Sequence, residues 1–208
     1  MVAEDEAERA RGQDDVLLML RTGTQDEHQD LERSLDLLDP HLDRERLGEI
    51  LHRMHGFWVS AEAGLDRWAV ARPADAATVD WSRRRRAALF AADLRTLHTT
   101  PAADGPSLPP VTDTDRALGR LYVLEGSTLG GTFIDRHLAA LPHLADVRIR
   151  AFSPYGDGTG AMWAGFRRVA RERVAAGGDA GTMVDSARDT FRALAAWCRP
   201  VAATPVSA

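Results

Sequence analysis

Apolar residues recur at three- and four-residue intervals along most of the chain, and no run of alternating β-forming residues is found among them. This spacing places apolar side chains on one face of an α-helix. The pattern therefore predicts an all-α fold, with helices at about 14–38, 43–71, 80–98, 113–140, 159–176 and 179–198. Pro40 should close the first helix and Arg72-Pro73 the second, because proline cannot continue a helix.

The predicted helices form a single domain over about residues 14–200, with tails at 1–13 and 201–208. The turn-rich segment Thr100–Pro110 is predicted to be a loop and not necessarily a domain linker, because the helices on both sides need burial. A chain of 208 residues is long enough to bury a sizeable core.

The charged residues exclude several classes of chemistry. The net charge is −5, which argues against a broad nucleic-acid-binding surface. All 26 basic residues are arginine, so a Walker-A lysine, a Schiff-base lysine and a lysine nucleophile are excluded. The run Arg83–Arg86 is expected on a helix that opens with Ser82, pointing to solvent.

The sequence predicts a cytoplasmic protein. Its one cysteine, Cys198, cannot form an internal disulfide, which fits a reducing compartment. The acidic start MVAEDEAERARGQDD lacks the apolar stretch of a signal peptide. No stretch approaches the roughly 18 apolar residues of a membrane span.

His28 stands out among the histidines because it continues an apolar stripe. The residues that share this helix face, at 4-3-4-3 spacing, are Thr24, His28, Leu31, Leu35 and Leu38. A core histidine is the ordinary explanation of such a position, and metal ligation is the alternative. Glu32, one turn on, could accept the proton of the ring nitrogen that does not bind the metal, and Arg21 could place a cation at the cavity edge.

The remaining histidines are interpreted as ordinary surface or core residues. His52 and His55 could share a helix face, but no glutamate or cysteine nearby completes a metal site. The others stand alone: His41, His98, His137 and His143.

Three glycines interrupt a pattern that otherwise predicts continuous helix over residues 121–138: Gly126, Gly130 and Gly131. Each mid-helix glycine costs about 0.8–1.0 kcal/mol relative to alanine, so the three together cost roughly 2.5–3 kcal/mol. Two explanations fit the spacing equally well. The glycines either let another helix approach closely, or they expose backbone to a flat ligand.

A glycine-rich segment at residues 156–160 has the spacing of a phosphate loop, but it follows no strand, and the chain has no lysine. We interpret it as a loop that leads into a helix near Thr159. On that helix Arg167 and Arg171 share a face, a spacing that is able to grip carboxylates. A solvated arginine face is the alternative.

Together these residues resemble the haem oxygenase family, in particular its bacterial branch associated with bacteriophytochromes. The most specific match is LYVLEGSTLGG at 121–131, which is similar to the distal-helix signature of that branch. Further similarity lies in RTGTQDEHQDLE at 21–32 and in the YG…G-x-x-W-x-x-F stretch from Tyr155 to Phe166. The resemblance covers about residues 14–200.

The resemblance implies a haem sandwiched between a proximal and a distal helix. It makes His28 the axial iron ligand and Glu32 its orienting partner. For the glycines, it favours the second explanation, in which bare backbone faces a flat ligand. The residues that it places near the haem propionates are Arg21, Tyr122, Arg167 and Arg171. The distal residues are Gly126, Ser127, Gly130 and Gly131, and Ser127 stands where animal-type members have an aspartate that organises water.

The activity that the resemblance implies is oxidative cleavage of haem to biliverdin, carbon monoxide and ferrous iron. Dioxygen is the oxidant, and electrons come from a ferredoxin or reductase, because the chain has no flavin or nicotinamide motif. A bacteriophytochrome is a candidate recipient of biliverdin. The main alternative is a non-catalytic haem carrier or sensor with the same fold. A di-iron oxygenase or thiaminase-like hydrolase is disfavoured, because the repeated Glu-x-x-His motif is absent and Cys198 is poorly placed as a nucleophile.

Overall fold

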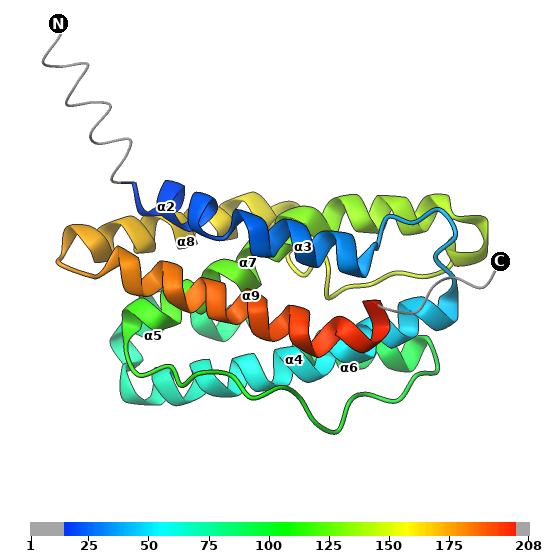
Figure 1. Ribbon diagram of the computed structural model, residues 1–208, viewed down its shortest axis with the longest axis horizontal. Helices are drawn as coiled ribbons and strands as arrows, with labels where there is room; N and C mark the ends of the chain where they lie inside the picture. Colours follow the sequence, from blue (N-terminus) through cyan, green and yellow to red (C-terminus); the bar gives the residue numbers. More distant parts are fainter. Residues whose placement is uncertain (1–14, 203–208) are drawn as a thin grey trace, which may run out of the picture.

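The computed structural model describes residues 15–202, and all regular secondary structure in this range is helical (Figure 1). The all-α prediction is therefore confirmed. The N-terminal tail predicted at 1–13 and residues 203–208 of the C-terminal tail lie outside the described residues. The longer helices are α2 (Val16–Gly23), α3 (Gln25–Leu35), α4 (Arg44–Ala71), α6 (Ala87–Thr96), α7 (Thr114–Ala140), α8 (Thr159–Ala175) and α9 (Ala180–Ala202).

The first predicted helix is in fact two helices, α2 and α3, which meet at Thr24. This residue leaves the helical region with φ −122° and ψ 8°, and its hydroxyl donates to the Leu20 carbonyl at 2.7 Å. Such back-bonding competes with the regular helix and favours a bend. The helix α3 then ends at Leu35, because Asp36 adopts a left-handed conformation with φ 43°, so Pro40 lies beyond the helix end.

The prediction of one helix over 80–98 is also wrong in its first half. A short helix α5 (Pro73–Thr78) and a 3-10 turn η1 (Trp81–Arg83) precede α6, which begins only at Ala87. The start of α6 is set by Glu62 of α4, whose carboxylate accepts from the backbone N–H groups of Arg86 and Ala87 at 2.6 and 2.8 Å. A cap from another helix leaves no local sequence signal.

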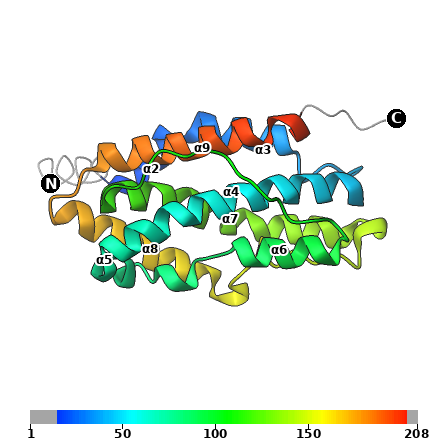
Figure 2. The same cartoon turned by 90° about the horizontal axis from the view of Figure 1, so that it is seen from below.

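Helix α9 lies against α2 and α3 on one side and against α4 and α7 on the other, as the two cartoon views show (Figures 1 and 2). It crosses α7 closely at Gly119, where a Cβ would collide with the backbone carbonyl of Met183. The apolar faces of these helices form one core, which extends to the buried free cysteine Cys198.

Residues 99–113 form a strap that runs beside α4, seen in green in Figure 2. Thr100–Pro110 contains no helix, as predicted. The strap approaches α4 closely at two glycines, where a Cβ would collide with strap atoms: Gly48 meets Thr99, and Gly56 meets Asp104. Gly64 instead makes room for the Arg120 side chain of α7. Helix α4 therefore offers bare backbone at two positions, eight residues apart, where the strap packs against it.

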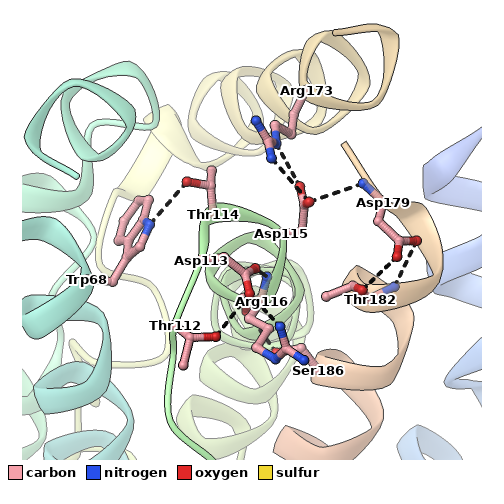
Figure 3. Close-up of polar contacts among 10 residues, drawn as sticks. All are labelled: Trp68, Thr112, Asp113, Thr114, Asp115, Arg116, Arg173, Asp179, Thr182 and Ser186. Carbon is pink, nitrogen blue, oxygen red and sulfur yellow. Dashed lines mark hydrogen bonds and ion pairs between the residues drawn. The ribbon is translucent and has the colours of Figure 1, made fainter. Parts of the chain in front are cut away.

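The N-terminal turn of α7 joins α8 and α9 through side-chain contacts (Figure 3). Asp113 caps the helix by accepting from the Arg116 N–H at 2.8 Å. Asp115 accepts from Arg173 of α8 at 2.7 Å and from the backbone N–H of Asp179, just before α9, at 3.1 Å. One carboxylate thereby fixes the turn between α8 and α9 relative to the start of α7.

Two further properties concern the whole described part of the chain. Among residues 15–202, no helix combines the length and the apolar character needed to cross a bilayer. In the same range, no three His, Cys, Asp or Glu side chains gather as a metal-binding cluster.

Candidate functional site

One face of α7 carries a stripe of residues that look toward α3. The stripe follows the helical spacing 4-4-3-4 and consists of Tyr122, Gly126, Gly130, Phe133 and His137. At one end the side chain of Thr24 lies close enough to Tyr122 to lower the pKa of its phenol, and at the other end His137 Nε2 lies 3.0 Å from the Asp39 carbonyl oxygen. The stripe residues between these contacts therefore face the segment that contains His28.

Between its two end contacts, this stripe is uncovered. A Cβ built on Gly126 or Gly130 would meet no atom within 4 Å. Phe133 is 66% exposed, and its neighbour Leu129 on the adjoining helix row is 41% exposed. An exposed aromatic ring, an exposed leucine and bare backbone close together on one helix are typical of a surface that binds an apolar partner.

The third glycine of this segment has a different role. Gly131 is buried, and a Cβ there would collide with the backbone carbonyl of Phe152. Gly119 makes the same kind of close approach to α9. The glycines thus divide between close packing and exposed backbone. Gly131 lets the Phe152 backbone pack closely, whereas Gly126 and Gly130 face open space.

His28 lies on α3 opposite this stripe, and its side chain is 50% exposed. Leu31 and Leu35 of the same apolar stripe are buried, so the spacing located the helix face correctly. The exposed ring excludes the core-histidine explanation. Its edge-on contact with Phe191 of α9, 5.5 Å between ring centroids, holds the ring from one side.

Glu32 lies one turn beyond His28, as the spacing predicts. Its Oε1 atom is 3.6 Å from His28 Nε2, which is longer than a hydrogen bond, and both side chains are at least half exposed. The carboxylate is within reach of the imidazole, but this structure does not pair them by a hydrogen bond.

Two comparisons locate the chain among known proteins. A heme oxygenase of Xanthomonas campestris pv. campestris (strain 8004) is 30% identical over 165 residues, which cover 77% of this chain and 95% of that protein. The chain belongs to the haem oxygenase family. No family model matches the sequence.

The fold is shared with solved haem oxygenases. The NO- and CO-bound haem oxygenase of Neisseria meningitidis superposes with a TM-score of 0.73 at 21% identity, covering 93% of this chain and 95% of that one. The haem oxygenase of Leptospira interrogans gives a TM-score of 0.67 at 14% identity, covering 89% and 99%. These likenesses support the predicted haem oxygenase-like architecture over nearly the whole chain.

The residues around the α3–α7 gap suit a haem. The bare backbone at Gly126 and Gly130 and the exposed ring of Phe133 offer a flat apolar surface on the α7 side, and His28 offers a nitrogen ligand on the α3 side. Haem iron is commonly held by one histidine, so the lack of a multi-residue metal cluster among the described residues does not conflict with this group.

The basic residues expected near the propionates lie where α2 meets α8. Tyr122 packs against Trp163 and Phe166 of α8, and burial raises the pKa of its phenol, while the charge of Arg21 nearby opposes this shift. Arg167 is half-buried, and its Nε has no hydrogen-bond partner among the described residues. A buried donor without an acceptor needs an explanation, and a ligand that supplies an acceptor is one.

Arg171 is differently placed. It donates to Asp15 at 2.7 Å, and this hydrogen bond holds the pKa of the Asp15 carboxyl below its ordinary value. Asp15 in turn caps α2 by accepting from the Leu17 N–H at 3.1 Å. The structure therefore brings Arg167 and Arg171 onto one face, as predicted, but Arg171 is already paired.

The expectation that Arg83–Arg86 points to solvent is wrong for two of the four residues. Arg84 and Arg86 are 3% and 1% exposed, because Arg84–Arg86 form an irregular connection between η1 and α6 in which alternate side chains turn inward. Arg84 forms an ion pair with the buried Glu125, which also accepts from the Tyr155 hydroxyl at 2.7 Å. Sequence reasoning missed these groups, and their one signal was Glu125 inside an apolar stretch of α7.

The other histidines behave as ordinary residues. His52 Nδ1 lies 2.8 Å from the Thr100 carbonyl oxygen, and His143 Nε2 lies 2.8 Å from the Leu42 carbonyl oxygen. His41 and His98 are exposed, whereas His55 is buried. The histidines other than His28 thus hold loops or sit in the core or at the surface.

Proposed function

We propose that this chain is an enzyme that cleaves haem oxidatively to biliverdin, carbon monoxide and ferrous iron, with dioxygen and externally supplied electrons. The observation that carries the proposal is the uncovered α7 stripe. Gly126 and Gly130 leave room on one side of the gap, and the half-exposed His28 lies on the other side. Membership of the haem oxygenase family supports the same activity.

Each residue then has a role toward the haem. His28 is the axial ligand, and Glu32 accepts the proton of the ring nitrogen that does not bind iron, which fixes the ring orientation. Because Glu32 Oε1 now lies near Nε2, this role requires a small rotation of the imidazole or of the carboxylate. Arg21, Tyr122 and Arg167 hold the propionates, and Arg171 joins them at the expense of its contact with Asp15.

The haem, when bound, supplies an iron that binds and activates dioxygen. The chain contributes space and orientation. The small residues Gly126 and Gly130 keep the distal side open, and the exposed ring of Phe133 and the exposed alkyl group of Leu129 keep water from that face. Arg167 fixes how the ring is rotated, and so which edge of the porphyrin lies under the glycines.

The finer assignments follow from the resemblance. The LYVLEGSTLGG segment supports the bacteriophytochrome-associated branch, in which biliverdin is handed to a photoreceptor as its chromophore. Electrons come from a ferredoxin or reductase in the cytoplasm. A direct check is a binding measurement between the purified chain, loaded with biliverdin, and a bacteriophytochrome apoprotein. Transfer faster than from free biliverdin is expected, and an equal rate would contradict a dedicated partner.

The test of the activity is a spectrum recorded over time. Haemin, the purified chain and an electron donor are mixed in air, with catalase present. We expect the haem bands to decay while a broad bilin absorption grows, and carbon monoxide to be released. Catalase should not abolish the reaction, because free peroxide is not the oxidant. A control without oxygen should leave the haem bands intact.

The same experiment separates an enzyme from a carrier. A stable ferrous-oxy complex that persists with excess reductant and yields no bilin on extraction would defeat the oxygenase proposal and leave a haem-binding protein. The open space at Gly126 and Gly130 argues against a carrier that holds iron with a second side chain, because no histidine or methionine occurs between these residues.

A further inference from the structure

A buried guanidinium lies behind the distal face of α7. Arg86, from the connection before α6, is 1% exposed and donates to the Leu124 carbonyl and, at 2.7 Å, to the Ser127 hydroxyl. Its other terminal nitrogen donates to the Ala151 carbonyl at 3.0 Å. Its plane lies over the Trp58 ring, 4.9 Å from the centroid.

This guanidinium has no carboxylate in salt-bridge contact among the described residues. Glu62 bonds to the backbone N–H of Arg86 and not to its side chain, and Glu125 pairs with Arg84. Burial disfavours the charged form of Arg86, and the nearby charges of Glu125 and Glu62 offset part of this cost without contacting its guanidinium. Retaining a costly buried charge argues that its position serves a function.

The contacts also decide what Ser127 can do. Its hydroxyl proton goes to the Leu124 carbonyl at 2.7 Å, and one lone pair accepts from Arg86. The hydroxyl therefore has no proton to donate to a ligand on the glycine face, and only one acceptor position is left. Ser127 acts as a bridge between α7 and Arg86, and the positive charge lies behind the turn that contains Gly126.

The connection that follows α7 is fixed by the same residue. Ala151 is held at both backbone groups: its carbonyl accepts from Arg86, and its N–H donates to Asp93 of α6 at 2.8 Å. The next residue, Phe152, presents its carbonyl to Gly131 of α7. Arg86 thus braces the glycine-containing part of α7 directly and through Ala151.

We infer that Arg86 is a positioning residue of the distal site, which holds the Leu124–Gly131 part of α7 in place and supplies a positive field that favours anionic ligands over the glycine face. This inference rests on the proposed function for its second part, because the ligand is one bound to haem at that face. Its first part concerns the protein alone and is tested without haem.

The first measurement uses the haem-free chain and follows amide hydrogen exchange over residues 124–131. Arg86→Lys should raise exchange in this segment, because an ammonium cannot reach three acceptors in fixed directions. The matched control is Arg83→Met, which alters an exposed arginine of the same run. Equal exchange in Arg86→Lys, Arg83→Met and the unmodified chain would overturn the bracing role, whatever the chain does with haem.

The second measurement compares an anionic and a neutral probe on the haem complex: azide on ferric haem and carbon monoxide on ferrous haem. Arg86→Met and Arg86→Gln should weaken azide on the order of tenfold, the effect of one unit charge roughly 10 Å away at an effective dielectric constant of about 20. Carbon monoxide affinity should stay within about twofold. Arg86→Lys should restore azide binding, and Arg83→Met should not change it.

The outcomes separate the possible failures. An equal loss for azide and carbon monoxide would show a merely structural role, and unchanged azide binding in the neutral variants would overturn the field. If both neutral variants unfold, the azide affinity of Arg86→Lys decides. An unchanged azide affinity, together with raised amide exchange in the haem-free chain, supports the proposal. A tenfold loss of azide affinity despite the retained charge overturns it. An unmodified chain that binds no haem would overturn the proposed function and the field, but not the bracing role.

Discussion

At the scale of single residues, the His28 ring packs against one aromatic side chain, lies near one carboxylate and is otherwise exposed. Phe191 meets its ring edge-on with an interplanar angle of 82°, and Glu32 lies within 3.6 Å of Nε2. Half of the side chain is still exposed. A ligand needs this combination, because its ring must be oriented before the metal arrives and one nitrogen must stay accessible.

Replacing His28 by alanine should therefore change haem binding specifically. The unmodified chain should bind haemin at one to one. His28→Ala should shift the ferric absorption spectrum and weaken binding by more than about tenfold, since loss of a second-shell partner alone costs about 10–100-fold. Titration followed by absorption checks both. His52→Ala is the control, because His52 holds the Thr100 carbonyl and faces the strap. Matching spectra and affinities in the two variants would contradict the axial assignment.

Arg167 and Arg171 should differ although they share a helix face. A charge-assisted hydrogen bond shielded from water contributes about 1.5–3 kcal/mol. Arg167→Ala should therefore weaken haemin binding about 10–100-fold or change the meso position that is cleaved, as read by chromatography of the biliverdin isomers. Arg171→Ala should have a smaller effect on binding, because Asp15 already occupies its guanidinium. If Arg167→Ala changed only the salt dependence, with affinity and isomer unaltered, the arginine would belong to a solvated face.

The sequence could predict some of these residues and not others, for a physical reason. The position of His28 follows from helix periodicity within one segment. Arg84 and Arg86 were misplaced because their acceptors, such as Glu125 and Ala151, lie on distant parts of the chain. Because the four consecutive residues are all arginine, they also give no polar–apolar pattern from which the buried ones could be predicted.

At the scale of elements, one turn of α7 presents an open face and a tightly packed face. Gly130 looks into open space, and Gly131 lies against the Phe152 carbonyl. Sequence spacing alone could not separate these roles, because both glycines carry the same helix penalty. The distinction comes from what packs on each face of α7.

Substitutions at the two glycines should thus have opposite effects. Gly130→Leu should keep or slightly raise thermal stability, since leucine is the better helix former, and should impair haem turnover by filling the distal face. Gly131→Ala should lower the free energy of unfolding by about 1–3 kcal/mol, because its Cβ would collide with backbone. Denaturant unfolding and the bilin assay check the pair. Full turnover by a folded Gly130→Leu chain would show that this glycine does not face the haem.

The helix boundaries show the same limit of local information. The start of α8 at Thr159 and the end of α4 before Pro73 agree with the predictions, because glycine and proline act locally. The break at Thr24 and the late start of α6 at Ala87 were missed. Thr24 donates its hydroxyl proton to the Leu20 carbonyl of the preceding helix, and α6 depends on a carboxylate from α4.

At the scale of the whole molecule, the strap at residues 99–113 couples α4 to the rest of the fold. Gly56 of α4 meets the strap, and the residue before it is His55, a buried histidine whose Nδ1 has no hydrogen-bond partner within the described residues. Burial lowers the pKa of His55, and the nearby His52 and Arg95 lower it further. The protonated form of His55 is therefore disfavoured in the folded state.

This buried histidine should make folding stability depend on pH. In the unfolded chain its pKa is near the ordinary value of about 6.5, so below that pH the unfolded state binds more protons than the folded state. The free energy of unfolding should then fall as pH decreases through about 6.5, by at most about 1.4 kcal/mol per pH unit from this group.

His55→Gln should reduce the slope of the free energy of unfolding against pH between about pH 5 and 7, measured by urea unfolding at each pH. His41→Gln, at an exposed site, should leave the slope unchanged. Groups that titrate in both proteins, such as Glu62 with its raised pKa, cancel in the comparison. An equal slope in His55→Gln and the unmodified chain would mean that His55 takes up a proton as readily in the fold as in the unfolded chain.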